Sequence, residues 1–178
     1  MSATDKSTSG LRLRHYGHKP IERVRRRVQE YGEWKPRGLW VSVEGNNDGW
    51  REWCEAEAFS GGWTHVYAVT LAVGANVLHV DTEHALVGFH ERWADYFAPY
   101  PGATYKRAAV DWQAVAKEYD GIIIAPYQWH YRLEGEISEW YYGWDCASGC
   151  IWRPRAISSF TRVNEEFARI REPAEVVA

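Results

Sequence analysis

Eleven tryptophans and eleven tyrosines are present in this chain of 178 residues. Their rings offer flat surfaces, and buried ones need hydrogen-bond partners, so a high content is typical of binding surfaces as well as of cores. Trp40 and Ser42 share one face of a predicted strand, and Trp50, Trp53 and Cys54 share one face of a predicted helix. These residues could stack a planar ring and bind its polar groups, or could simply fill a core between strand and helix.

Residues 127–149 are dense in aromatic and acidic residues and have no clear period. A stretch of this length without periodicity in a compact domain is often functional. Its best-placed carboxylate is Asp145, because the apolar neighbours Trp144 and Cys146 could shift the pKa of its carboxyl group. A turn or cap role is the structural alternative for Asp145. The competing acids of the same stretch are Glu134, Glu136 and Glu139.

Length and composition favour a single globular domain, with 46% hydrophobic and 25% charged residues. We expect a disordered leader over 1–10, one domain over 11–172 and a frayed tail over 173–178. There is no run of 18 apolar residues and no apolar signal core near the N-terminus, so we expect no membrane partner and a cytoplasmic location. A net charge of −3 gives no general attraction for nucleic acid.

Hydrophobic periodicity predicts an α+β fold of antiparallel or mixed strands. The predicted strands cover residues 11–16, 38–43, 63–71, 77–80, 121–125, 150–152 and 156–163. Helices are predicted after Pro20 as far as Tyr31, after Asp48, from Thr82 to about Phe97, after Asp111 and over 164–170.

The order of these elements resembles the NAD-binding half of ADP-ribosyltransferases of the diphtheria-toxin and poly(ADP-ribose) polymerase type. The resemblance lies in a strand carrying His15, the strand Gly38–Ser42, the helix Trp50–Cys54 and the strands from Tyr67 to Val80. Residues 119–152 are similar to the last strands of that family, including those of small phage-encoded members. The resemblance covers roughly residues 11–163 and implies split mixed or antiparallel sheets with flanking helices.

The resemblance implies an enzyme that uses NAD as its substrate, without a metal, and transfers ADP-ribose to a protein or nucleic-acid acceptor or hydrolyses NAD, as in a toxin or phage effector. Positive charge grows on the ribose as the bond to nicotinamide breaks, so such a site needs a clamp for the ring and a nearby carboxylate. Asp145 would be the catalytic carboxylate. The NAD-binding residues would be His15, Gly17, Trp40, Ser42 and Trp53.

Other interpretations stay open at this point. No Glu stands at the start of the last strand, where Ser148, Gly149 and Cys150 lie, so a catalytically silent nucleotide-binding module is the main alternative. The basic run 23–27 could contact the NAD pyrophosphate or a nucleic acid, could serve RNA 2′-phosphotransfer together with His15, or could be a solvated face paired with acids. Zinc binding and a Cys–His nucleophile have little support, because the chain has three cysteines and only one close pair.

Overall fold

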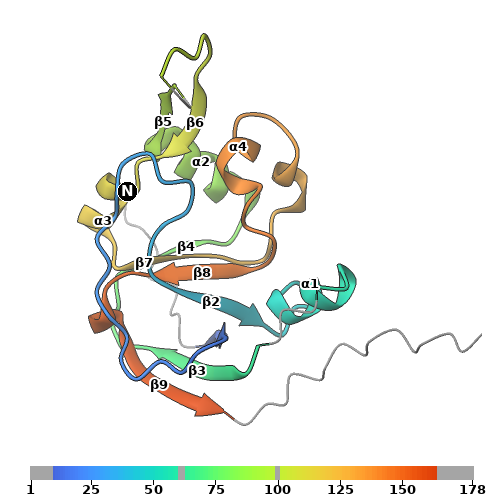
Figure 1. Ribbon diagram of the computed structural model, residues 1–178, viewed down its shortest axis with the longest axis vertical. Coiled ribbons are helices and arrows are strands. Elements are labelled where there is room, and N and C mark those ends of the chain that lie inside the picture. Colours follow the sequence, from blue (N-terminus) through green and yellow to red (C-terminus); the bar gives the residue numbers. More distant parts are fainter. Residues whose placement is uncertain (1–9, 60–62, 99–100, 164–178) are drawn as a thin grey trace, which may run out of the picture.

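The computed structural model describes residues 10–59, 63–98 and 101–163. Most of the expected leader, the tail over 173–178 and the helix expected over 164–170 lie outside these residues. Within them the fold is α+β, with a mixed sheet and a few helices (Figure 1). No helix in the described ranges is long and apolar enough to cross a membrane.

Seven strands form one sheet in the order β4-β7-β8-β2-β1-β3-β9. They are β1 (Arg12–Gly17), β2 (Leu39–Glu44), β3 (His65–Leu71), β4 (Val77–Val80), β7 (Gly121–Ile124), β8 (Ser148–Ile151) and β9 (Ile157–Val163). Of these neighbours, only β4 and β7 run parallel, because the long connection between them returns the chain in the same direction. The strands that the resemblance assigns to split sheets are thus hydrogen-bonded into a single sheet.

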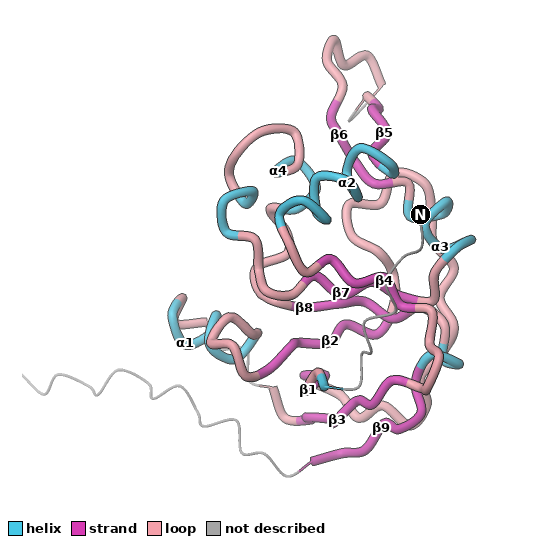
Figure 2. Tube along the Cα trace, turned by 180° about the vertical axis from the view of Figure 1, so that it is seen from behind, coloured by secondary structure: helices cyan, strands magenta, loops and turns pink. Residues whose placement is uncertain are grey.

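A second, two-stranded sheet consists of β5 (Ala94–Phe97) and β6 (Arg107–Val110). It projects beyond the large sheet in the two opposite views of Figures 1 and 2. The prediction of a helix up to Phe97 was therefore wrong in its last turn. The helix ends at Trp93, because the following residues pair with β6 through the contact of Asp95 with Ala109.

The helices are α1 (Trp50–Ala56), α2 (Glu83–Trp93), α3 (Trp112–Glu118) and α4 (Ser138–Tyr141). Two predicted caps are confirmed: the side chains of Thr82 and Asp111 accept hydrogen bonds from the backbone N–H groups of Ala85 and Ala114. Asp48 does not cap α1. Its carboxylate accepts instead from the N–H of Tyr127, 2.9 Å away, and so ties α1 to the segment after β7.

The helix predicted from Pro20 to Tyr31 is absent, and these residues form an irregular segment. Their backbone donors bind other parts of the chain: the N–H of Ile21 donates to the hydroxyl of Tyr67, and the N–H of Arg27 donates to the carbonyl of Trp152. Ile21 packs against the core, but Tyr31 is 58% exposed. The helix-like spacing of apolar residues therefore reflects only partial burial and not one continuous apolar face.

Much of the tryptophan content does fill the core. Trp112 from α3, Trp140 from α4, Trp144 and Trp152 are each no more than 1% exposed. They belong to the same core cluster as the isoleucines of β7, which are no more than 1% exposed, as expected for a strand covered on both faces. The core interpretation thus holds for these four indoles, of which Trp144 also borders a cleft, and the indoles outside this set are candidates for a binding surface.

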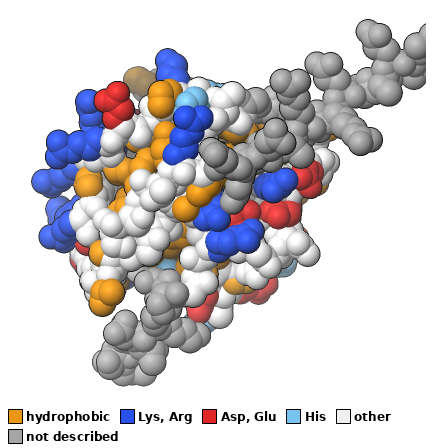
Figure 3. All heavy atoms as spheres, turned by 90° about the horizontal axis from the view of Figure 1, so that it is seen from below, with side chains coloured by type: hydrophobic (Ala, Val, Ile, Leu, Met, Phe, Trp, Pro, Cys, Tyr) orange, Lys and Arg blue, Asp and Glu red, His pale blue; other side chains and the backbone are white. Residues whose placement is uncertain are grey.

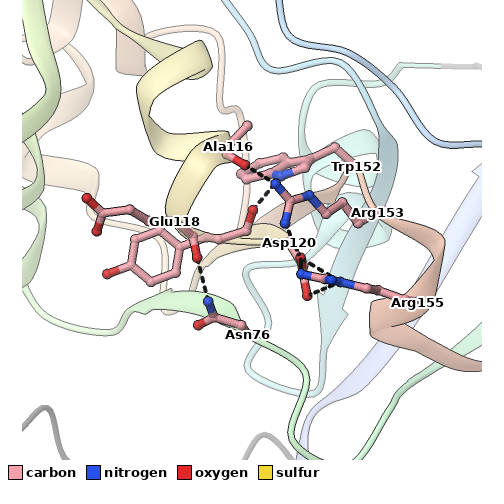
Figure 4. Close-up of polar contacts among 8 residues, drawn as sticks. Asn76, Ala116, Glu118, Asp120, Trp152, Arg153 and Arg155 are labelled. Atoms are coloured by element: carbon pink, nitrogen blue, oxygen red, sulfur yellow. Dashed lines mark hydrogen bonds and ion pairs between the residues drawn. The ribbon is translucent and has the colours of Figure 1, made fainter.

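An ion-pair cluster fastens the start of β7 to the end of β8 (Figure 4). The buried carboxylate of Asp120 accepts from Arg153 at 3.1 Å and from Arg155 at 2.8 Å. The backbone carbonyl of Asp120 accepts from the N–H of Trp152, and the indole N–H of that residue donates to the carbonyl of Tyr119. Asp120 is therefore an anchor between two segments that are far apart in sequence.

Candidate functional site

A cleft of about 260 Å³ lies on one face of β1 and β2, between α1 and the segment before β8. We call it the tryptophan cleft. Its aromatic lining consists of Tyr16, Trp40, Trp50, Trp63 and Trp144. Its polar lining includes Arg14, Lys35, Ser42, Asp145, Cys146 and Ser148. Four indoles therefore meet a carboxylate and two cationic side chains in one hollow.

The register of β1 and β2 determines which side chains reach the cleft. Arg14 pairs with Ser42, so by alternation Arg14 and Tyr16 lie on the same face as Trp40 and Ser42. Ser42 is buried, and its hydroxyl accepts a hydrogen bond from the N–H of Trp50 at 2.8 Å. This bond holds the first turn of α1 against β2 and thereby places the Trp50 ring at the cleft.

Trp50 and not Trp53 is the tryptophan of α1 that lines the cleft. Trp53 stacks on Trp50 with ring centroids 4.9 Å apart and an angle of 14° between the planes. Trp63 meets Trp50 edge-on at 5.7 Å. Trp40 likewise packs edge-on against Trp144, at 4.9 Å. Each indole of the cleft is thus held by a second one, which limits its rotation.

Asp145 lies at the cleft with its side chain 27% exposed, and Arg132 is 3.7 Å from its Oδ1. Burial raises the pKa of the Asp145 carboxyl, while the charges of Lys35 and Arg132 act in the opposite direction. The Nζ of Lys35 also lies 5.2 Å from the centre of the Trp40 ring, in cation–π contact. The face of the Trp40 ring therefore already contacts a positive charge.

The three competing acids do not line the cleft. Glu136 accepts from the hydroxyl of Tyr96, and Glu139 accepts from the backbone N–H of Ala108, so both fasten the β5–β6 sheet. Glu134 lies 3.7 Å from the ring of His130. Asp145 is consequently the one acid of that stretch that lines the tryptophan cleft.

His15 lies on the opposite face of the sheet from Trp40 and Ser42. Its Nδ1 is 2.7 Å from the Trp40 carbonyl, which can only accept, so Nδ1 carries the proton. Burial lowers the pKa of the imidazole, which favours this neutral form. A Cβ at Gly17 would come within 3.2 Å of the His15 ring, so Gly17 leaves room for that ring. Neither His15 nor Gly17 lines the tryptophan cleft.

The three cysteines are buried and unpaired. Burial raises the pKa of Cys54 to about 11 and of Cys146 to about 12, so both are neutral thiols near pH 7 and poor nucleophiles. Over the described ranges, no three His, Cys, Asp or Glu side chains gather closely enough to hold a metal ion.

Sequence reasoning missed several residues of the cleft: Arg14, Tyr16, Lys35, Trp63 and Trp144. Strand alternation would have identified Arg14 and Tyr16, given the register between β1 and β2. No alternation or periodicity could have placed Lys35 at the cleft, because it lies in an irregular segment. Comparison of the chain with family models, curated proteins and solved structures finds no match.

Proposed function

We propose that the tryptophan cleft binds NAD by its nicotinamide end. The observation that carries this proposal is that Trp40, Trp50 and the carboxylate of Asp145 line one cleft. A cationic ring on an indole face gains about 0.5–2 kcal/mol, depending on its desolvation. In the bound state the ring would take the place of the Lys35 ammonium on Trp40.

The size and charge of the cleft support the same ligand. A volume of about 260 Å³ is small for a binding pocket and suits one ring with its sugar better than a whole dinucleotide. The remainder of NAD would extend outside, and the cationic side chains of Arg14 and Lys35, which line the cleft, would contact its phosphates. The aromatic lining would therefore select the ring and the cations would select the anionic part.

Asp145 supplies the carboxylate for a reaction at this site. As the bond between nicotinamide and ribose breaks, positive charge develops on the ribose, and a carboxylate beside it stabilises that charge. The bonding pair leaves with nicotinamide, and water or a protein or nucleic-acid acceptor then bonds to the anomeric carbon and releases a proton to solvent. We therefore propose an NAD-consuming enzyme of the ADP-ribosyltransferase type, and the proposal does not use His15.

Nicotinamide release from NAD tests this activity. The wild-type protein should release nicotinamide, and Asp145→Asn should do so about 10²–10³-fold more slowly, the usual cost of losing one transition-state stabiliser. Glu134→Gln, which removes a carboxylate outside the cleft, is the matched control and should keep the wild-type rate. Absence of release by the wild type, or equal rates in the two variants, would contradict the enzymatic proposal.

The charge balance favours a second candidate, a catalytically silent nucleotide-binding module. Arg14 and Lys35 line the cleft and Arg132 adjoins Asp145, so cations outnumber the single carboxylate. This module would bind NAD without turnover, and Asp145→Asn would leave its dissociation constant nearly unchanged. Fluorescence quenching of the cleft tryptophans by NAD, measured beside nicotinamide release, distinguishes the two candidates.

A further inference from the structure

A second cleft, of about 410 Å³, lies between His15 and the irregular segment that follows β1. His15 points to the sheet face opposite the tryptophan cleft, so the two sites are separate. Arg23, Arg25 and Arg27 line this second cleft. Arg26 lines a neighbouring hollow together with Arg153 and Arg155. We call Arg23, Arg25, Arg26 and Arg27 the arginine segment.

The charges of the arginine segment are not neutralised by the described residues. All four side chains are exposed, and none makes an ion pair within the described ranges. Of the two nearby acids, Glu22 lines the same cleft but forms no ion pair within the described ranges, and Glu30 binds Arg37. Close by, Arg153 and Arg155 share the single carboxylate of Asp120 and so keep an excess of positive charge.

Space-filling representation shows the same concentration of charge. Lys and Arg side chains gather along the left edge of the molecule in Figure 3, the edge along which the irregular segment runs in Figure 1. The whole chain carries a net charge of −3, so this local excess is not a consequence of composition. Clustered cations without counter-charges repel one another, and such clustering is typical of surfaces that bind phosphates.

Exposed aromatic rings continue the same segment. Tyr31 is 58% exposed and Trp34 is 48% exposed, and the Arg107 guanidinium lies 5.7 Å from the Trp34 ring. Cations that follow a phosphate backbone, together with rings on which bases can stack, characterise proteins that bind single-stranded nucleic acid. The segment is irregular, and reading a duplex through its major groove usually needs a helix or a β-ribbon.

We propose that the arginine segment, together with Tyr31 and Trp34, binds single-stranded nucleic acid. The arginines contact the phosphates, and the two aromatic rings stack with bases. This site is independent of NAD binding, because the second cleft, which Arg23, Arg25 and Arg27 line, is on the sheet face that carries His15 and shares no lining residue with the tryptophan cleft.

Fluorescence anisotropy of the full chain with a fluorescein-labelled single-stranded RNA, a single-stranded DNA and a duplex tests the proposal. The wild type should bind the single strands more tightly than the duplex, and its affinity should fall with salt. The double variant Arg25→Ala/Arg27→Ala should bind at least tenfold more weakly. The slope of log affinity against log salt should become shallower by about 1.4, since each lost phosphate contact on a single strand contributes about 0.7.

The matched control is Arg51→Ala/Arg162→Ala, which removes the same charge from α1 and β9 and should leave the affinity within about twofold. Single variants Arg25→Gln and Arg27→Gln replace the double variant if it melts at a lower temperature than the wild type. Absence of binding by the wild type, equal weakening in the control, or a preference for the duplex would overturn the proposal. Binding to phosphatidylserine vesicles without binding to either single strand would also overturn it.

Discussion

Trp50 and Trp53 stack face to face on α1 at 4.9 Å, and only Trp50 lines the tryptophan cleft. Trp53 is three residues later on the helix and therefore supports the ring of Trp50 from behind. The sequence places both indoles on one face of the same helix, but only Trp50 is positioned to contact a ligand in the cleft. Substitutions at the two sites should therefore have different consequences.

We predict that Trp50→Ala raises the dissociation constant for NAD by about tenfold or more, because a stacked ring contributes about 1–3 kcal/mol. Trp53→Phe keeps an aromatic ring behind Trp50 and should change the dissociation constant by less than about threefold. Isothermal titration calorimetry measures both, and melting temperatures establish that each variant is folded. Similar losses of affinity in the two variants would contradict the assignment of Trp50 to the ligand.

The burial of Asp145 has a consequence for stability. Its pKa is raised in the folded protein above the ordinary value of 3.8, so at a pH between these two values the folded state holds a proton that the unfolded state has lost. The wild-type free energy of unfolding should fall as pH rises from the ordinary pKa to the folded-state pKa of Asp145. The variant Asp145→Asn has no carboxyl group at this position and should not show this fall. Urea denaturation of both proteins at acidic and neutral pH measures the difference. A difference that stays constant with pH would contradict the burial of the charge.

His15 should respond to pH in the opposite direction. Its pKa is lowered below the ordinary value of 6.5, so on acidification the unfolded state takes up a proton first. Stability is therefore lost as pH falls from 6.5 through the folded-state value. His15→Gln should lose less stability over this range than the wild type in urea denaturation. The pKa values of His79 and His90 are lowered too, but both residues are present in both proteins and cancel in the comparison.

The Asp120 anchor should contribute measurably to stability. Asp120→Asn leaves two arginines facing a neutral group and should lower the free energy of unfolding by about 1–3 kcal/mol. This expected loss of stability is smaller than for a fully buried ion pair, because Arg155 is 68% exposed. Glu91→Gln, on the exposed side of α2, should change stability by less than about 0.5 kcal/mol. A loss for Asp120→Asn as small as that of the control would show that the cluster does not hold β7 to β8.

Local patterns in the sequence predicted those elements that local physics determines. Alternation predicted β1, β2 and β3, and a continuous apolar run predicted β7. The capping side chains of Thr82 and Asp111 identified the starts of α2 and α3. The strand predicted over 150–152 overlaps β8 only in part, because β8 begins at Ser148. The residues after Pro20 were predicted wrongly, because apolar residues at helical spacing are not sufficient when backbone donors find partners in other segments. The β5–β6 pair was missed because Phe97 continues the helical spacing of Phe89 and Trp93, and because Arg107–Val110 has no alternation.

The candidate site depended on relationships that a single sequence does not specify. Trp40, Ser42 and Asp145 were nominated together and do line one cleft. His15 does not line this cleft, because Arg14 pairs with Ser42 and His15, as the next residue of the strand, points to the opposite face. A single sequence does not specify that pairing. Whether Trp50 or Trp53 reaches the ligand depends on the rotation of α1 about its axis, which the bond from Ser42 to Trp50 sets.

The proposed nicotinamide site lies in the tryptophan cleft beside Asp145. A crystal of the protein soaked with NAD is the decisive experiment for this site. We predict density for the ring in contact with Trp40 and Trp50, with Asp145 next to the ribose and Lys35 displaced from the Trp40 face. An empty tryptophan cleft at saturating NAD, or nicotinamide density against His15 on the other face of the sheet, would contradict it.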